Sequence, residues 1–295
     1  MGSGPRHPSP ILGTTRFTAI FGDPVEHSLS PTMHNAAYAA LRMDRRYVAF
    51  HVTPKELTSA LRGIQAMGVL GINLTVPHKE AALRVMDQVR TEGILLGAIN
   101  CVINRNGKLI GDNTDARGLE RDLRRLAIRT KGRTVLIVGA GGGAASAALA
   151  VKRLGASRAI IANRTRSRAG ALARRCARVS RAGTVFEGAG LECLRDSRLL
   201  ATTACVINAT PMGLTTGRFV PLNYGATPSD CFFYDLLYAR RPTPFLQGAI
   251  RARRKYADGA GMLVEQGELA FKLFNGVAAP RGVMRRALMD ALGRK

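Results

Sequence analysis

An uncharged stretch of 18 residues, TVLIVGAGGGAASAALAV at 134–151, constrains the fold more than any other feature of the chain. Its length approaches that of a membrane-spanning helix. Four glycines in its middle divide it into a short β-branched strand and a helix of small residues, and no other segment suggests a span. A strand, a glycine-rich turn and a helix in that order begin a βαβ unit, so we predict a protein without membrane segments.

Strands and helices alternate along both halves of the sequence. In the first half we expect strands at 16–22, 45–52, 68–77 and a short pair near 98–110, with helices at 31–43, 54–67, from about 78 and from about 115. In the second half we expect strands at 134–138, 158–163, 204–210 and 231–237, helices from the glycine turn to about 154 and at 166–176, and a helical C-terminus. This alternation predicts two α/β domains, the first with a mainly parallel sheet.

Composition limits the class of protein. With 295 residues, 46% of them hydrophobic, the chain can bury two sizeable cores. Five scattered cysteines form no CxxC pair, which favours a reducing compartment and a cytoplasmic location. The first ten residues, MGSGPRHPSP, have no apolar segment, so they are not a secretory signal, and we expect residues 1–15 to be disordered.

The net charge of +24 raises the question of a nucleic-acid partner. Residues 1–115 hold 12 basic and 9 acidic side chains, whereas 116–295 hold 32 and 11, so the second half carries almost all of the charge. Aromatic residues make up only 5%, tryptophan is absent, and no known nucleic-acid motif occurs. A solvated basic surface without nucleic acid is the favoured interpretation, with a polyanion-binding surface as the alternative.

The glycine-rich turn follows a GxGxxA pattern made by Gly139, Gly141 and Ala144. In dinucleotide-binding folds the first glycine permits a tight turn, the second lets the backbone approach a pyrophosphate, and the small third residue lets helix and strand pack. The helix N-terminus then attracts the phosphates. The pattern predicts a dinucleotide site, with a purely structural turn as the alternative.

The end of the next strand, ANRTRSRA, favours one of the two nicotinamide cofactors. NAD sites place an acidic residue there to bond the ribose diol, but this sequence has Asn163 followed by Arg164, Arg166 and Arg168. These cations suit an additional phosphate on the 2′ position of the ribose. We therefore predict NADP, although solvent exposure alone would also explain Arg166.

HSLSPTMHN at 27–35 places two hydroxyls beside an expected helix start. Ser28 and Ser30 point to one side of an extended segment, and Pro31 suits the first helical position. The hydroxyls and the free N–H groups of the helix together attract an anion such as a carboxylate. The alternative is that Ser30 only caps the helix. His27 and His34 are interpreted as packing or loop residues because no third metal ligand has suitable spacing.

Two further segments carry groups suited to proton transfer. In GINLTVPHK, Asn73 and Thr75 share one face of a strand, and Lys79 follows at an expected helix start, where the helix dipole disfavours its charge. In GDNTD, Asp115 occupies a strand-to-helix turn. A lysine and an aspartate in contact can move a proton to or from a hydroxyl while a nicotinamide moves the hydride.

These motifs together resemble those of the shikimate dehydrogenases. The shared motifs, in order, are GDPVEHSLSPTMHN, GINLTVPHK, GAIN, GDNTDARG, GAGGGA, NRT, INATPMG, YDLLY and GMLVEQG. They extend from about Phe17 to Asn275, so the resemblance covers nearly the whole chain. It implies a cytoplasmic enzyme of aromatic amino-acid biosynthesis that reduces 3-dehydroshikimate to shikimate with NADPH.

The resemblance also implies roles for individual residues. Lys79 and Asp115 match the catalytic pair, and Ser28 and Ser30 match the grip on the substrate carboxylate. The remaining substrate-binding positions match Asn73, Thr75, Asn100, Tyr238 and Gln266. The cofactor-binding positions match Gly139, Ala140, Gly141, Gly142, Gly143, Ala144, Asn163, Arg164, Thr165, Arg168, Thr210, Met212 and Gly261.

The family fold implies a substrate domain of residues 16–115 plus about 258–295, a Rossmann-like NADP-binding domain of 116–257, and a cleft between them. We expect a monomer or a homodimer. A quinate/shikimate dehydrogenase that uses NAD or NADP, or a weakly active paralogue, is the alternative. The chain departs from the family pattern at Cys101, where threonine is common, at Glu268, where a small residue is usual, and at Phe274, where tryptophan is common.

Overall fold

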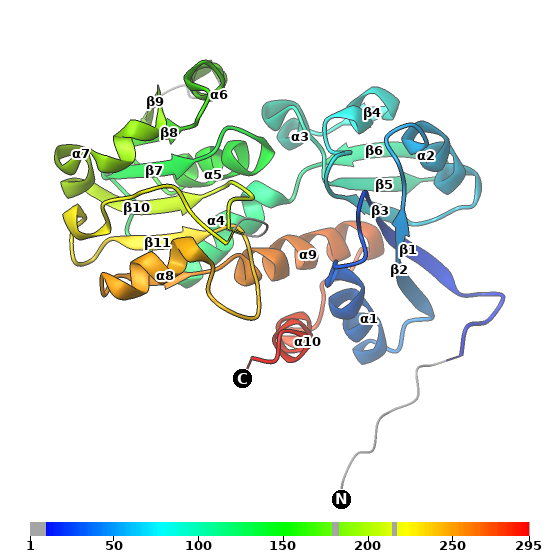
Figure 1. Cartoon of the computed structure of the whole chain (residues 1–295). Coiled ribbons are helices and arrows are strands. Elements are labelled where there is room, and N and C mark those ends of the chain that lie inside the picture. The colour runs from blue at the N-terminus through cyan, green and yellow to red at the C-terminus, as the bar shows by residue number, and fades with distance from the viewer. Residues whose placement is uncertain (1–9, 179–182, 214–216, 295) are drawn as a thin grey trace, which may run out of the picture. The chain divides into compact units, whose positions relative to one another are not determined.

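A computed structural model describes residues 10–178, 183–213 and 217–294, and these form two compact units (Figure 1). The first unit holds the chain up to Asp112 together with Gly267–Ala291, and the second holds Asn113–Gln266 with Leu292–Arg294. Of the N-terminal segment that we expect to be disordered, residues 1–9 lie outside the described part. Thr15 at its end is buried, and its hydroxyl donates to Asp44 Oδ1 over 2.5 Å.

The first unit is built on a six-stranded sheet in the order β2-β1-β3-β5-β6-β4. Its strands are β1 (Arg16–Gly22), β2 (Arg45–His51), β3 (Gly71–Leu74), β4 (Gln88–Val89), β5 (Cys101–Arg105) and β6 (Lys108–Asp112). β1 is parallel to β2 and β3, and β4 is parallel to β6, whereas β5 is antiparallel to both of its neighbours. The expected mainly parallel sheet is present, and the predicted strand pair near 98–110 is its antiparallel part.

Helices bury the apolar positions of this sheet. They are α1 (Ser30–Ala40), α2 (Leu57–Ala66), α3 (Thr91–Leu96), α10 (Val283–Ala291), the second half of α9 (Ala260–Asn275) and a 3-10 helix, η1 (Ala81–Val85). Leu57, Leu61 and Ile64 of α2 pack on alternate residues of the strands, Ala19 and Phe21 among them. α1 lies beside α10 (Figure 1).

Our prediction of a helix from about 78 was wrong. The chain makes a turn at 76–80, in which the N–H of His78 donates to the carbonyl of Thr75, and only the short 3-10 helix η1 follows. The ring of His78 is buried and bonds the carbonyl of Val52 over 2.7 Å. This tertiary contact holds the segment in a turn, which the local sequence pattern does not reveal.

The second unit contains a fully parallel sheet in the order β12-β11-β10-β7-β8-β9. Its strands are β7 (Thr134–Val138), β8 (Arg158–Ala162), β9 (Val185–Ala189), β10 (Thr203–Asn208), β11 (Phe232–Asp235) and β12 (Lys255–Ala257). The order reverses at β7, because β8 lies on one side of it and β10 on the other. This is the doubly wound arrangement expected from the glycine-rich turn. The edge strands β9 and β12 were not predicted.

Helices pack around this second sheet. They are α4 (Asp115–Arg125), α5 (Gly142–Arg153), α6 (Arg166–Arg178), α7 (Ser197–Ala201), α8 (Pro244–Arg251), the first half of α9 and the 3-10 helices η2 (Leu191–Arg195) and η3 (Tyr224–Ala226). Most of the buried residues of α5 are alanines, and their small side chains let the helix approach its neighbours closely. Among the described helices, none has the length and apolar character needed to cross a membrane.

Candidate active site

One edge of the first sheet gathers most of the predicted substrate residues. In the strand register Phe21 lies opposite Leu74, Asn73 opposite Cys101, and Cys101 opposite Asp112. The ends of β1, β3 and β6 and the start of β5 therefore meet at the same edge. The segments there carry Ser28, Ser30, Thr75, Lys79 and Asn100.

Ser28 and Ser30 lie where β1 leads into α1. Ser30 is the first residue of α1 and Leu29 precedes it as the cap, so the alternative interpretation, in which Ser30 only caps the helix, was wrong. The hydroxyl oxygen of Ser28 instead accepts from the N–H of Ser30 over 3.3 Å. Ser28 is half-buried and Ser30 is 4% exposed. The N–H of Ser30 is therefore bonded, Pro31 has no N–H, and that of Met33 donates to the carbonyl of Leu29, so the N–H of Thr32 is the group at the start of α1 that suits an anion.

The two asparagines are held together by direct bonds. The side-chain amide of Asn73 donates to the carbonyl of Asn100 over 3.0 Å, and its oxygen accepts from the hydroxyl of Tyr47 over 2.8 Å. The backbone N–H of Leu74 donates to the same carbonyl of Asn100. Because both asparagines are buried, these bonds fix the start of β5 against β3.

Lys79 is tied to the same edge through its backbone. Its carbonyl accepts from the N–H of Ile99 over 2.8 Å, beside Asn100, and its side chain is half-buried. Lys79 does not start a helix, so the argument that a helix dipole disfavours its charge does not apply. Thr75 lies between β3 and this turn, and its N–H donates to the carbonyl of Phe21.

Asp115 is the first residue of α4, as predicted from its strand-to-helix position. It is 8% exposed, and its N–H donates to the side-chain oxygen of Asn113 over 2.9 Å. A carboxylate in the first turn complements the helix dipole. Lys79 belongs to the first unit and Asp115 to the second, so their pairing stays a prediction.

Gln266 and Gly261 lie in α9, where it packs on α4. A Cβ on Gly118 would lie 2.7 Å from the backbone nitrogen of Gln266, so only glycine permits this approach. The hydroxyl of Thr114 donates to the Gln266 side-chain oxygen over 3.4 Å. Gly261 in turn faces the carboxylate of Asp122, which a Cβ at that position would overlap.

Asp122 is a buried residue that sequence reasoning missed. Its carboxylate accepts from the hydroxyl of Tyr234 over 2.7 Å and pairs with Arg125 at 2.8 Å. This network joins α4, β11 and the start of α9 within the second unit. The only sequence signal is an acidic residue seven positions after Asp115, on the same face of α4.

The glycine-rich turn has the geometry of a phosphate cradle. Gly139 has φ of +120°, and a Cβ there would lie 2.9 Å from the carbonyl oxygen of Ala209, so glycine is required. Nothing lies within 4 Å of a Cβ built on Gly141 or Gly142. α5 begins at Gly142 without a side-chain cap, and its free N–H groups are available for an anion. Ala140, Gly143 and Ala144 complete the turn.

The segment after β8 lies next to this turn. The N–H of Gly139 donates to the carbonyl of Ala162 over 2.8 Å, and Asn163 follows directly. Its side-chain amide donates to the carbonyl of Thr165 over 3.1 Å. Arg164, Thr165 and Arg168 are exposed, so two cations stand beside the glycine turn where an NAD site has an acid.

Residues after β10 and β11 complete the edge of the second sheet. The side-chain oxygen of Asn208 accepts from the N–H and the hydroxyl of Thr210, and the N–H of Met212 donates to that hydroxyl over 3.3 Å. The amide of Asn208 donates to Asp235 over 2.9 Å. Tyr238 follows β11 and is half-buried, and burial raises the pKa of its phenol.

Asp235 is a second buried acid that the sequence analysis did not select. It accepts from Asn208, from the N–H of Leu237 over 3.1 Å and from the hydroxyl of Thr243 over 2.5 Å. Burial raises the pKa of Asp235 to about 6, although these bonds oppose the shift. The signal that could have found it is a polar residue at the end of an apolar strand.

The histidine and cysteine residues do not form a site in the described part of the chain. His34 is 1% exposed and stacks on Tyr47 with ring centroids 4.1 Å apart, and burial lowers its pKa to about 3. The five cysteines, all within the described ranges, form no disulfide. The described residues include no group of His, Cys, Asp or Glu that could hold a metal ion.

Taken together, the open glycine cradle, the uncapped start of α5 and the arginines after β8 fit a phosphorylated dinucleotide. A doubly wound sheet with this cradle, together with a second α/β unit that presents hydroxyls, amides and a lysine, defines a dinucleotide-dependent α/β oxidoreductase.

Comparison with known proteins identifies the family. Residues 20–102 match the shikimate dehydrogenase substrate binding domain, 122–191 match the shikimate/quinate 5-dehydrogenase domain, and 259–289 match the shikimate 5'-dehydrogenase C-terminal domain. A shikimate dehydrogenase (NADP(+)) of Citrifermentans bemidjiense is 41% identical over 283 residues, which are 96% of this chain and 97% of that protein. The chain belongs to the shikimate dehydrogenase family.

Solved structures support the same assignment. A shikimate dehydrogenase in complex with NADP+ superposes with a TM-score of 0.87 at 35% identity, covering 98% of this chain and 99% of that one. A shikimate 5-dehydrogenase from Thermus thermophilus, in complex with NADP(H) and shikimate, gives 0.82 at 33% identity and covers 94% and 100%. The predicted fold of two α/β domains is confirmed.

Proposed function

We propose that this protein catalyses the reversible, NADPH-dependent reduction of 3-dehydroshikimate to shikimate in aromatic amino-acid biosynthesis. The relatives named shikimate dehydrogenase (NADP(+)) support this function. The structural observation that carries it is the single sheet edge where two serine hydroxyls, a buried asparagine and a lysine gather. These groups are complementary to a small polyhydroxylated carboxylic acid.

In this proposal Ser28 and Ser30 bind the substrate carboxylate, aided by the start of α1. Thr75, Asn100 and Gln266 bind the ring hydroxyls, and Asn73 and Tyr238 lie near the substrate. The bond between Asn73 and the Asn100 carbonyl supports this assignment, because it holds the Asn100 backbone at a fixed position.

Lys79 supplies the proton to the reacting oxygen during reduction and removes it during oxidation, and Asp115 orients Lys79. When bound, NADPH supplies the hydride to the carbonyl carbon. Hydride and proton together convert the ketone to an alcohol, so the step balances in both directions.

The proposed NADP site comprises the turn from Gly139 to Ala144 for the pyrophosphate and the segment after β8 for the 2′-phosphate. In that segment Arg164 and Arg168 supply positive charge, while Asn163 and Thr165 shape the loop. Thr210, Met212 and Gly261 are proposed to hold the nicotinamide. We also propose that the protein is cytoplasmic, in agreement with its cysteines, which form no disulfide. We further propose that it does not bind nucleic acid, in agreement with its few aromatic residues, and that it acts as a monomer or a homodimer.

The test is absorbance at the reduced-nicotinamide band when purified protein meets shikimate or quinate, each with NADP or NAD. We expect strong reduction of the cofactor with shikimate and NADP. A preference for quinate or for NAD would support the second candidate, a quinate/shikimate dehydrogenase, which the family description covering residues 122–191 also includes. Absence of reaction in all four mixtures would indicate a weakly active paralogue.

A further inference from the structure

A buried carboxylate lies against a glycine of the proposed nicotinamide site. Asp122 in α4 is fully buried, and a Cβ built on Gly261 would overlap both of its carboxylate oxygens. Because a side chain at Gly261 would displace the carboxylate, only glycine permits this contact. The backbone of α9 at Gly261 therefore rests directly on Asp122.

Protein donors occupy both oxygens of this carboxylate. Arg125 of α4 donates from Nε to Oδ1 over 2.9 Å, and the hydroxyl of Tyr234 in β11 donates to Oδ2 over 2.7 Å. A buried charge is costly unless such partners satisfy it, so these bonds hold Asp122 in one orientation. With both oxygens bonded inside the protein, Asp122 acts on the site through the chain and not by contact with a ligand.

Tyr234 connects the carboxylate with the first turn of α9. Burial raises the pKa of the Tyr234 phenol and Asp122 raises it further, whereas a hydrogen bond from the backbone of Met262 opposes the shift. Met262 directly follows Gly261 in α9. The hydroxyl thus donates to Asp122 and accepts from the backbone beside Gly261. A negative charge at this end of α9 also complements the helix dipole.

One face of α4 extends from the proposed catalytic aspartate to this contact. Asp115, Gly118 and Asp122 are three and four residues apart, so they share that face. Gly118 meets the backbone of Gln266. Asp122 lies further along α4 and meets Gly261, which comes earlier in α9, so the two helices run antiparallel here. The helix that carries Asp115 thereby determines where α9 begins.

We propose that Asp122 is a positioning residue for the nicotinamide half of the cofactor. It holds the first turn of α9 at the place where Gly261 is proposed to contact the nicotinamide, so that the hydride is aligned with the substrate. This inference rests on the function proposed above. It concerns one half of the cofactor, because Asp122 acts on α9, whereas the 2′-phosphate is proposed to bind Arg164 and Arg168 after β8.

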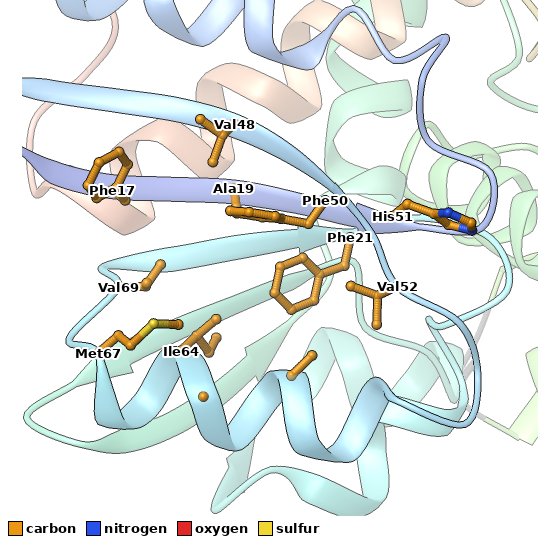
Figure 2. Close-up of a pocket in the computed structure, with 12 residues that line it drawn as sticks. Phe17, Ala19, Phe21, Val48, Phe50, His51, Val52, Ile64, Met67 and Val69 are labelled. Atoms are coloured by element: carbon orange, nitrogen blue, oxygen red, sulfur yellow. The ribbon is translucent and has the colours of Figure 1, made fainter. Parts of the chain in front are cut away.

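An apolar pocket in the first unit does not suit the cofactor. It has a volume of about 600 Å³ and lies between β1, β2 and α2. Figure 2 shows side chains from both strands and from α2 pointing into it, including Phe17, Phe21, Val48 and Ile64. Its twelve lining residues include no Lys, Arg, Asp or Glu, so they offer no counter-charge to phosphates. The affinity for NADPH therefore reports on the glycine cradle and its surroundings.

Two ligands separate a positioning role from a merely structural one. NADPH carries the nicotinamide, whereas adenosine 2′,5′-bisphosphate represents only the adenosine half. In Asp122→Ala we expect calorimetry to show about tenfold weaker NADPH binding, because the nicotinamide loses an aligned contact. Hydride transfer to 3-dehydroshikimate should slow about 10²-fold in single-turnover measurements, because the nicotinamide is misplaced. Adenosine 2′,5′-bisphosphate should bind within a factor of about two of the wild type, since its site is distant from the change.

Asp230→Ala is the matched control for this variant. Asp230 also pairs with an arginine, Arg133, at 2.8 Å. That pair precedes β7 and β11, whereas the glycine cradle follows β7, so it stands at the opposite edge of the same sheet. We expect Asp230→Ala to bind both ligands like the wild type.

Tyr234→Phe is the second variant, and it tests the same network if Asp122→Ala does not fold. It keeps the ring and removes one donor to the carboxylate, so NADPH should bind about threefold more weakly and adenosine 2′,5′-bisphosphate equally well. Tyr224→Phe is its control, because the Tyr224 hydroxyl donates to the carbonyl of Phe245 over 3.0 Å in the same unit. Circular dichroism of each variant verifies folding.

The outcomes distinguish this inference from the proposed function. Equal weakening of both ligands in the folded variants, or unchanged NADPH affinity in them, would overturn the positioning role of Asp122. A wild type that binds NADPH but does not reduce 3-dehydroshikimate would contradict the proposed function, and the comparison of the two ligands would still test Asp122. A wild type that does not bind NADPH would overturn both.

Discussion

Ser28 shows how one hydroxyl can have a structural and a binding role. Its oxygen accepts from the N–H of Ser30, and its proton remains available for an acceptor such as a carboxylate. Ser28 is half-buried, so such a bond would form partly shielded from water.

We expect Ser28→Ala to weaken shikimate binding more than it slows turnover. Loss of one hydrogen bond to a charged group costs about 1.5–3 kcal/mol, so the substrate Michaelis constant should rise about 10- to 100-fold. Steady-state kinetics at saturating NADP measures this change, and exposed Ser229→Ala is the control. An unchanged Michaelis constant in Ser28→Ala would remove Ser28 from the proposed site.

Arg168 tests the predicted preference for NADP over NAD. Arg168→Ala should raise the Michaelis constant for NADP about tenfold or more, because a charge-assisted bond to a phosphate is lost, and should leave the value for NAD nearly unchanged. Arg178→Ala, an exposed arginine at the end of the same helix, is the matched control. Equal effects on NADP and NAD would show that Arg168 does not contact the 2′-phosphate.

The contact between the helices α4 and α9 holds Gln266 close to the start of α4. Gly118 permits that contact, because any larger residue would meet the backbone of Gln266. α9 also meets Asp122 at Gly261, so the helix is fixed at two points within the second unit.

Gly118→Ala should therefore destabilise the protein by about 1–3 kcal/mol and lower kcat/KM for shikimate, because the added methyl forces α9 away from α4. Gly63→Ala in α2 is the matched control, since its Cβ would meet only the end of Met67 at 3.8 Å. That change should stabilise by up to about 1 kcal/mol. Urea unfolding and initial rates measure both. Equal stability of the two variants would contradict the tight contact.

The buried Asp235 predicts a pH dependence of stability. Its pKa is about 6 in the folded protein, above the usual 3.8, so the protonated form is favoured on folding. The resulting stabilisation is complete below pH 3.8 and is lost as the pH rises through 6. Across this range the free energy of unfolding should fall by about 3 kcal/mol. In Asp235→Asn this loss between pH 4.5 and 7.5 should disappear from urea unfolding curves. The same pH dependence in variant and wild type would contradict the raised pKa.

Prediction from sequence succeeded where local pattern decides the structure. The β-branched run before Gly139 predicted β7 and its glycine turn, and Asp115 was correctly placed at the start of α4. It failed where tertiary contacts decide: His78 holds its segment in a turn through Val52, and Asp122 and Asp235 gain their environments from distant residues. The edge strand β12 has only three residues to show a pattern, and β9, with the sequence VFEGA, has no buried position and therefore no apolar run.

The proposed reaction depends on residues of both units of the molecule. The first unit presents Lys79 and most of the predicted substrate residues, and the second presents the glycine cradle and the arginines after β8. Lys79 is proposed to provide the proton that accompanies hydride transfer from NADPH, so a change at Lys79 should affect the chemical step without affecting cofactor binding.

The most direct test is the single-turnover rate at which enzyme-bound NADPH reduces 3-dehydroshikimate, compared between wild type and Lys79→Ala. Removal of a general acid should slow this step about 10²- to 10⁴-fold, while NADPH affinity, measured by calorimetry, stays within a factor of about two. A Lys79→Ala rate close to that of the wild type would contradict the proposed role of Lys79 in proton transfer.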